Sequence, residues 1–259
     1  MKYAKRSLGQ NFLTDKNIIK KIINLTKIRN RDVFEIGPGN GALTDEILKK
    51  NPKSLSVIEK DFDLAEKLKN KYFKNKIIKV YKGDILKFDI ENIIAKNSLI
   101  FGNLPFNISS QILVKFLKFS HWPPRFKELI FMFQKELGEK IVGKFPSSEY
   151  GRISILSNYR LDIVNKFLIS PNCFIPKPKV TSMIIQFKPK KQMINLNINN
   201  LEKITQIFFS NKRKMINKNI HKLLGKKKIN KISRLDVNLR PSEIQPEIYY
   251  KITKLYERD

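Results

Sequence analysis

Asp32-Val33-Phe34-Glu35-Ile36-Gly37-Pro38-Gly39-Asn40-Gly41 is the stretch of sequence that decides the fold. Its first five residues, with Val33, Phe34 and Ile36, predict a short buried strand, and a helical stretch follows at residues 42–50. The glycines between them permit a tight turn and let the backbone approach a ligand closely. A glycine-rich turn alone is weak evidence for a nucleoside cofactor, because many such turns only connect a strand to a helix.

The same alternation of strands and helices continues through about residue 135. Further strands are predicted at residues 54–58, 77–81, 98–101 and 129–133, and helices at residues 61–71 and 109–119. Strands that alternate with helices imply crossover connections and a mainly parallel sheet. The predicted fold class is therefore α/β, with a Rossmann-like, doubly wound sheet.

The pattern changes in the last third of the chain. Residues 174–178 form a proline-marked loop, residues 180–187 alternate as in a late strand, and residues 188–200 are polar without clear periodicity, which indicates a linker. Helical spacing begins at Leu201. We therefore expect a sheet domain over residues 1–189 and a small helical domain over residues 190–259.

Net charge is the strongest signal in the composition. The chain of 259 residues has 52 basic and 23 acidic side chains, a formal net charge of +29. Such an excess favours nucleic acid as a partner, bound through phosphate contacts that weaken as salt rises. The sequence is also rich in Lys, Asn and Ile throughout, as an AT-biased genome would produce, so part of the excess can lie on solvated faces. Charge alone leaves an anionic membrane surface open as a partner.

Metal-ligating and membrane-spanning patterns are both missing from the sequence. One cysteine and two histidines, far apart along the chain, give no spacing typical of zinc ligands, so no metal is expected. No apolar run approaches the ~20 residues that a membrane-spanning helix needs. No apolar signal segment follows the basic N-terminus. We expect a cytoplasmic protein.

Two acidic residues follow strands of the predicted sheet. Glu59 ends the second strand, 20 residues after Gly39, where a carboxylate can bind ribose hydroxyls. Asp84 follows the third strand and can accept a hydrogen bond from the exocyclic amine of a cofactor's adenine. Each has a plainer interpretation, Glu59 as a solvated strand end and Asp84 as a helix N-cap. These features would equally suit a nicotinamide cofactor.

The fourth strand decides between these cofactors. It is followed by Asn103-Leu104-Pro105-Phe106, which resembles the short motif of methyltransferases that modify exocyclic amines. The lone pair of the adenine N6 atom is delocalised into the ring, so this amine is a poor nucleophile. The Asn103 side-chain oxygen and the Leu104 carbonyl can accept both N6 hydrogens and aim the nitrogen at a methyl donor.

The last two residues of the tetrapeptide suit the same reaction. Pro105 can stiffen the turn by fixing its backbone angle. Phe106 can stack on an adenine that has left its own base stack, an interaction worth roughly 1–3 kcal/mol per base. The plainer interpretation is a proline turn beside a buried phenylalanine.

With these motifs in place, the chain resembles the ribosomal RNA adenine dimethyltransferase family, and within it the bacterial small-subunit branch. The resemblance covers nearly the whole chain. It rests on Leu8-Gly9-Gln10-Asn11-Phe12-Leu13, Glu35-Ile36-Gly37-Pro38-Gly39, Gly102-Asn103-Leu104-Pro105-Phe106, Met132-Phe133-Gln134-Lys135-Glu136, Tyr150-Gly151-Arg152 and Phe174-Ile175-Pro176-Lys177-Pro178-Lys179-Val180.

The resemblance implies a function and a set of site residues. It implies that S-adenosylmethionine is the cofactor and that the substrate is two adjacent adenines near the 3′ end of 16S rRNA, in the small ribosomal subunit or its late precursor. The implied cofactor contacts are Asn11, Leu13, Gly37, Gly39, Glu59, Asp84 and Asn103. The family also suggests that Phe174 flanks the target base opposite Phe106, although a core aromatic residue beside a proline loop fits Phe174 equally well.

The C-terminal region separates the small-subunit branch from the branch that methylates large-subunit RNA. Residues 208–219 resemble the basic helix of the small-subunit branch, and Lys212, Arg213 and Lys214 can bind phosphate there. A solvated helix face is the commoner role of such a charge run. The domain over residues 190–259 is therefore expected to bind RNA. Phe106 stands where the branch usually has tyrosine, and a phenyl ring still stacks.

Three other interpretations compete with this enzyme. A small-subunit assembly factor could keep the fold without turnover, but it would not need Asn103 to Phe106, Glu59 and Asp84. A DNA adenine methyltransferase usually has proline where this chain has Leu104. A large-subunit rRNA methyltransferase is the third. We expect a monomer, and we have no sequence-based role for Arg152.

Overall fold

The computed structural model describes residues 5, 9–191, 193–233 and 235–258. Leu8, the first residue of one matching motif, lies outside the described residues. The chain divides into two compact units, residues 1–138 with 162–189 and residues 139–161 with 190–259. The sequence-based division fell between residues 189 and 190, whereas the contacts group residues 139–161 with the C-terminal segment.

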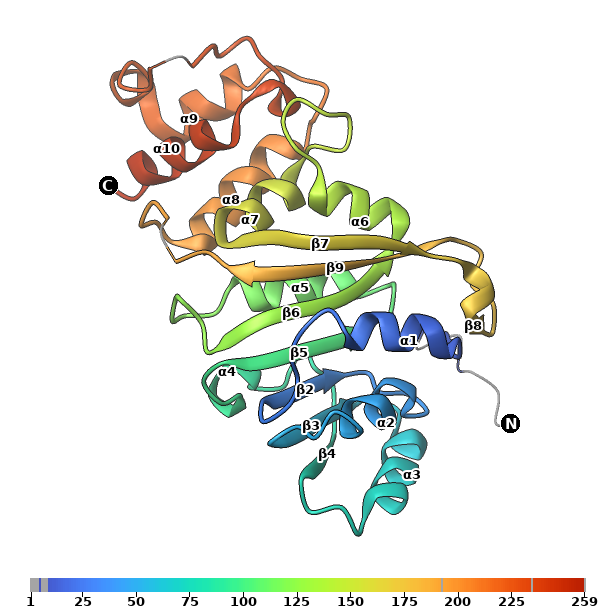
Figure 1. Ribbon diagram of the computed structural model, residues 1–259. Coiled ribbons are helices and arrows are strands. Elements are labelled where there is room, and N and C mark those ends of the chain that lie inside the picture. The colour runs from blue at the N-terminus through green and yellow to red at the C-terminus, as the bar shows by residue number, and fades with distance from the viewer. Residues whose placement is uncertain (1–4, 6–8, 192, 234, 259) are drawn as a thin grey trace. The chain divides into compact units, whose positions relative to one another are not determined.

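The first unit is built on a seven-stranded sheet with the order β4-β3-β2-β5-β6-β9-β7 (Figure 1). Its strands are β2 (Asp32–Ile36), β3 (Ser54–Glu59), β4 (Ile78–Lys82), β5 (Ser98–Asn103), β6 (Phe126–Gln134), β7 (Leu161–Ile169) and β9 (Ser182–Pro189). The pairs from β4 to β6 are parallel, and β9 is antiparallel to β6. The predicted α/β, mainly parallel sheet is confirmed.

Both faces of the sheet are covered, which explains why its strands are apolar at successive positions. Because side chains alternate between faces, Val33 joins one core and Phe34 points to the other. The first core also holds Ile19, Ile22 and Ile23 of α1 (Lys16–Ile23) and Leu43 and Ile47 of α2 (Ala42–Leu48). On the second face, Phe116 of α5 (Ser109–Leu117) packs against Phe126 and Phe131. In Figure 1, α1 lies in front of the sheet and α5 behind it.

The remaining elements of the first unit are α3 (Phe62–Tyr72), α4 (Ile90–Ile93), β1 (Phe12–Leu13) and β8 (Phe174–Ile175). β1 and β8 pair antiparallel as a separate two-stranded sheet, with Phe12 opposite Ile175 and Leu13 opposite Phe174. The sequence pattern did not predict α1, α4, β1, β7 or β8. The two-residue strands carry too little pattern to be seen in sequence, because only pairing between distant segments creates them.

The second unit is helical. It contains α7 (Arg152–Arg160), α8 (Ile198–Phe209), α9 (Asn217–Ile229) and α10 (Pro246–Tyr256), and α6 (Lys135–Val142) spans the division between the units. Part of the predicted linker is packed rather than free: the Tyr159 hydroxyl donates to the Ile194 carbonyl at 2.6 Å, and Leu196 is buried. Among the described residues, no helix is long and apolar enough to cross a membrane.

Candidate active site

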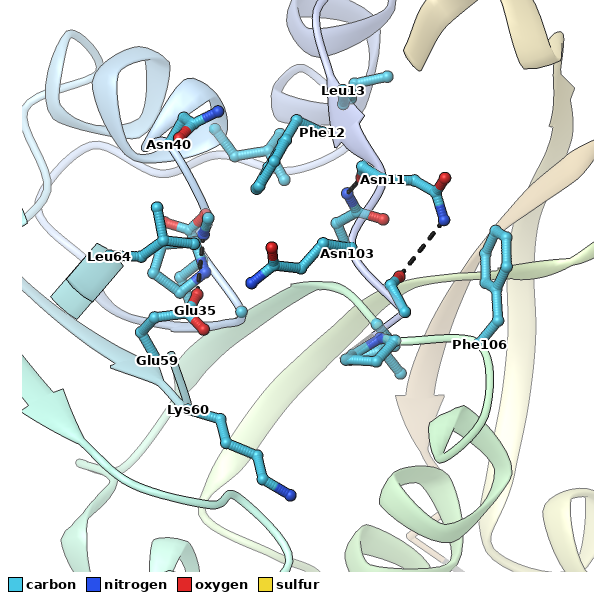
Figure 2. Close-up of a pocket in the computed structure, with 18 of the residues that line it drawn as sticks. Asn11, Phe12, Leu13, Glu35, Asn40, Glu59, Lys60, Leu64, Asn103 and Phe106 are labelled. Atoms are coloured by element: carbon cyan, nitrogen blue, oxygen red, sulfur yellow. Dashed lines mark hydrogen bonds between the residues drawn. The ribbon is translucent and has the colours of Figure 1, made fainter. Parts of the chain in front are cut away.

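The site lies at the switch point of the sheet, between β2 and β5: β3 and β4 follow on one side of β2, and β5 and β6 follow on the other. β3 and β5 flank β2 on opposite sides, with Ile36 in register with Ile58 and Gly102. The carboxyl ends of these parallel strands therefore meet, which is the usual ligand position in such sheets. One pocket lies at this edge (Figure 2), and its lining residues are Gly9, Gln10, Asn11, Phe12, Leu13, Glu35, Gly37, Pro38, Gly39, Asn40, Leu43, Glu59, Lys60, Leu64, Asn103, Leu104, Pro105, Phe106, Asn107 and Ile108.

The glycine turn brings backbone close to this pocket. Gly37 and Gly39 have φ angles of +66° and +57°, a conformation that other residues rarely adopt. A Cβ atom on Gly39 would lie 2.9 Å from the Phe12 ring, so a side chain there would collide with the N-terminal segment. The turn thus has the geometry that sequence analysis expected of a ligand-binding loop.

Glu59 ends β3 inside the pocket and is 7% exposed. Its Oε2 atom accepts a hydrogen bond from the Gly39 N–H at 3.0 Å, and its Oε1 atom accepts one from the Asp61 N–H at 2.9 Å. Burial raises the pKa of Glu59 above its usual value, although these backbone donors oppose the shift. Each oxygen keeps a second lone pair that can accept a ribose hydroxyl.

Asp84 lies further from the pocket than sequence analysis expected. It does not line the pocket; its Oδ2 atom binds Lys60 Nζ at 2.8 Å and its Oδ1 atom accepts the Leu86 N–H at 2.9 Å. The hydrogen bond from Lys60 holds the pKa of Asp84 below its usual value. Asp84 therefore caps a turn and not the helix that its plainer interpretation expected, and Lys60, not Asp84, lines the pocket.

Asn103 ends β5 with its amide oriented by the N-terminal segment. Its Nδ2 atom donates to the Asn11 carbonyl at 3.0 Å (Figure 2). Because the amide nitrogen faces Asn11, Oδ1 remains as an acceptor. The next residue, Leu104, is 2% exposed, and its side chain anchors the turn in the core. Phe106 is half-buried and lines the pocket, so a face of its ring can meet a planar ligand.

The N-terminal segment contributes Asn11 and Leu13 to the lining of the pocket. Asn11 acts through its main chain toward Asn103, while its side-chain amide donates to the Gly9 carbonyl at 3.3 Å. Leu13 is 3% exposed and belongs to the sheet core. Sequence pattern alone could not place these residues here, because they are joined to Asn103 only by tertiary contact.

Phe174 does not stand where the family resemblance suggested. It is 2% exposed and packs in the core cluster with Leu13 and Ile184. A ring with so little exposed surface cannot stack on a base without leaving that core. The plainer interpretation, a core aromatic beside the proline loop, matches this geometry.

The three basic residues of the second unit lie in a turn and not on a helix. Lys212, Arg213 and Lys214 fall between the end of α8 at Phe209 and the start of α9 at Asn217. The expected basic helix is therefore corrected to a basic turn. Its three side chains are exposed and available to phosphate.

Sequence analysis missed Glu35 as a pocket residue. It is 1% exposed on β2, lines the pocket, and accepts a hydrogen bond from the Thr44 hydroxyl at 2.7 Å. Burial raises the pKa of Glu35 to about 8, and nearby Glu59 adds to the shift. The available signal was an ionisable residue between the apolar Phe34 and Ile36 of a strand expected to be buried. Gln10, Phe12 and Leu64 also line the pocket without having been singled out.

Arg152 receives a structural role within the second unit. Its Nη2 atom binds Glu202 Oε1 at 3.0 Å, which links α7 to α8. This ion pair satisfies Nη2, whereas the buried Nε atom of Arg152 has no hydrogen-bond partner among the described residues.

The chain is similar to known proteins along nearly its whole length. The family described as ribosomal RNA adenine dimethylase matches residues 1–258. Ribosomal RNA small subunit methyltransferase A of Pelagibacter ubique is 45% identical, covering 98% of this chain and 97% of the relative. Similar solved structures include a dimethyladenosine transferase from Plasmodium falciparum, with a TM-score of 0.78, 26% identity and coverage of 95% and 98% of the two chains. The 23S rRNA methyltransferase ErmE shares the fold, with a TM-score of 0.70, 20% identity and coverage of 95% and 100%.

Proposed function

The chain belongs to the ribosomal RNA adenine dimethylase family, and from that premise we propose that it methylates the N6 amines of two adjacent adenines near the 3′ end of 16S rRNA. S-adenosylmethionine is the proposed methyl donor. The substrate is the RNA within the small ribosomal subunit or its late precursor. The observation that supports this most directly is Asn103 at the end of β5, held by Asn11 so that its Oδ1 atom is left to accept a hydrogen bond.

The residues at the sheet edge suit S-adenosylmethionine. Gly39 lets the turn lie close against the Phe12 ring at the edge of the pocket, and Glu59, which is 7% exposed, offers acceptors for ribose hydroxyls. Leu43 and Leu64 supply apolar lining. Lys60 and Asp84 form an ion pair that we assign to the adenine end of the cofactor. When bound, the cofactor supplies a methyl group on a sulfonium, which is already a good leaving group.

The reacting amine is oriented by the tetrapeptide. Asn103 Oδ1 and the Leu104 carbonyl accept the two N6 hydrogens, which favours a pyramidal nitrogen whose lone pair is no longer delocalised into the ring and can point at the methyl donor. Phe106 stacks on one face of the flipped base. Positioning and electrostatics supply the catalysis, so no general base is needed for attack. The methylated nitrogen is cationic after attack and then releases one proton to solvent. For the second methyl group the site must also accept an amine that has already been methylated.

The basic turn of the second unit is proposed to bind RNA phosphate. Lys212, Arg213 and Lys214 are exposed side chains in one short segment. Such contacts set the position of the protein on RNA and read no bases.

Methyl transfer from labelled S-adenosylmethionine tests the proposal. Unmethylated small subunits, large subunits and DNA are offered in parallel, and methylated bases are mapped along the RNA. We expect N6,N6-dimethyladenine at two adjacent positions of the small-subunit RNA only. Salt-sensitive binding to small subunits without transfer to any substrate would contradict the proposal and favour a non-catalytic assembly factor.

A further inference from the structure

The N-terminal segment of residues 9–13 is tied to two sides of the pocket. On one side, the Asn11 carbonyl accepts the Asn103 amide at 3.0 Å, and β1 pairs with β8. On the other side, Gln10 Nε2 donates to Asp61 Oδ2 at 2.9 Å. This segment therefore connects the end of β5, which carries the catalytic tetrapeptide, with the loop that follows β3.

Asp61 stands at the centre of the second attachment. Although it is only 4% exposed, both oxygens of its carboxylate accept hydrogen bonds: besides the bond from Gln10 to Oδ2, Oδ1 accepts from Lys5 Nζ at 2.9 Å and from the Asp63 N–H at 3.0 Å. Its own N–H donates to Glu59 Oε1 at 2.9 Å. Burial alone would raise the pKa of Asp61, but hydrogen bonds from Lys5 and Gln10 lower it below the usual value. Asp61 is therefore ionised at neutral pH.

We infer that Asp61 is a positioning residue that latches the N-terminal segment against the Glu59 side of the pocket. This inference rests on the proposed function. One network then runs from the ribose-binding carboxylate of Glu59, through Asp61 and Gln10, to the segment whose Asn11 carbonyl orients Asn103. Cofactor binding and the orientation of the catalytic amide are coupled through this network.

The N-cap of α1, Asp15, provides a comparison for Asp61, which is the N-cap of α3. Asp15 caps α1 by accepting the N–H groups of both Asn17 and Ile18 through one oxygen. Asp61 caps α3 with a single backbone bond, to Asp63, and directs its other oxygen to Gln10. Asparagine is also a good N-cap residue, so an Asp-to-Asn change keeps the cap at either position. At Asp61 this change removes a negative charge. That charge attracts Lys5 and strengthens the hydrogen bond from Gln10.

The experiment measures binding of S-adenosylhomocysteine to the full chain by calorimetry, with its dissociation rate followed by stopped flow. The variants are Asp61→Asn, Gln10→Ala, their double combination, and Asp15→Asn as the matched control. We expect each latch variant to weaken binding about tenfold, mainly through faster dissociation, because a hydrogen bond to a charged group is lost. The double variant should lose no more than the weaker-binding of the two single variants, because both changes break the Gln10–Asp61 contact. The Tm of the ligand-free variants should stay close to that of the wild type.

The possible outcomes separate the latch from the function on which it rests. No binding by the wild-type chain would overturn both proposals. Wild-type binding with equal affinity in Asp61→Asn and Gln10→Ala would overturn the latch alone. An equal loss in Asp15→Asn, or additive losses in the double variant, would show that general effects of capping or stability explain the result, and would also overturn the latch.

Discussion

The pocket of the first unit and the basic turn of the second unit are both rich in polar side chains, but they are held differently. In the pocket, Glu59 and Asn103 are each fixed by hydrogen bonds of 3.0 Å or less to backbone atoms of other segments. In the basic turn, Lys212, Arg213 and Lys214 are exposed, and the turn is closed by a bond from the Lys214 N–H to the Asn211 carbonyl. The pocket is preorganised, whereas the turn can adapt.

This difference teaches what each region contributes. Fixed acceptors can orient a reacting amine, and the orientation is lost when one of them is removed. Exposed basic side chains act through charge, and each contributes a modest, salt-dependent share. Substitutions in the pocket should therefore abolish methyl transfer while binding of RNA persists. Substitutions in the turn should weaken binding of RNA while the methyl-transfer site stays intact.

Asn103→Ala tests the first half of this contrast and should have the largest effect. We expect the rate of methyl transfer to fall by about 10²–10³-fold, the range for loss of one preorganised transition-state contact. RNA affinity should stay within about twofold of wild type, because Asn103 lies in the pocket and not in the basic turn. Labelled methyl transfer and filter binding measure the two quantities. Asn172→Ala, an exposed asparagine outside the pocket, is the matched control. Transfer at the wild-type rate in Asn103→Ala would remove it from the mechanism.

Sequence reached further in the pocket than in the turn, for a physical reason. Strand period and glycine position located β2 to β5 along the chain, so Gly37, Glu59 and Asn103 were singled out as strand-end residues before any contact was known. Which way a side chain points is set by tertiary contacts. Asp84 occupies the expected strand end, yet it faces Lys60 and Leu86.

Residues that depend on pairing between distant segments were the hardest to predict. Phe174 is buried because β8 pairs with β1. In this pairing Phe174 lies opposite Leu13, which is 161 residues away in the sequence, and no local pattern shows this. In the second unit, charge predicted that Lys212 to Lys214 are exposed but not that they form a turn. A helical pattern continues through residues 208–219 in sequence, and the break after Phe209 appears only in the structure.

Glu35→Gln sharpens the pocket side of the contrast, with an intermediate effect. The pKa of Glu35 is raised to about 8 in the folded chain from 4.5. At any pH between these two pKa values, unfolding releases a proton from Glu35. The free energy of unfolding of the wild type therefore falls as pH rises from about 5 to about 8. Glutamine cannot ionise and still accepts the Thr44 hydroxyl. Relative to Glu35→Gln, the wild type should lose about 2–3 kcal/mol of unfolding free energy between pH 6 and pH 8.

Denaturant unfolding of the ligand-free chain at several pH values checks this expectation. Glu91→Gln serves as the control, because the pKa of Glu91 is lowered: burial raises it, but hydrogen bonds from His121 and Ser120 outweigh that effect. Its variant should therefore leave the slope between pH 6 and pH 8 unchanged. Parallel pH profiles for wild type and Glu35→Gln would mean that Glu35 is ionised in the folded chain.

Replacing Lys212, Arg213 and Lys214 together by alanine tests the turn and should have the smallest effect. We expect about a tenfold loss of affinity for small-subunit RNA, and a plot of log affinity against log salt that is shallower by about 3, one for each phosphate contact. Cofactor affinity should not change. The matched control replaces Lys49, Lys50 and Lys53 of the first unit by alanine, which removes the same charge from exposed positions. If both triple variants lose affinity and salt slope equally, RNA binding reflects the overall charge of +29, and the basic turn has no special part in it.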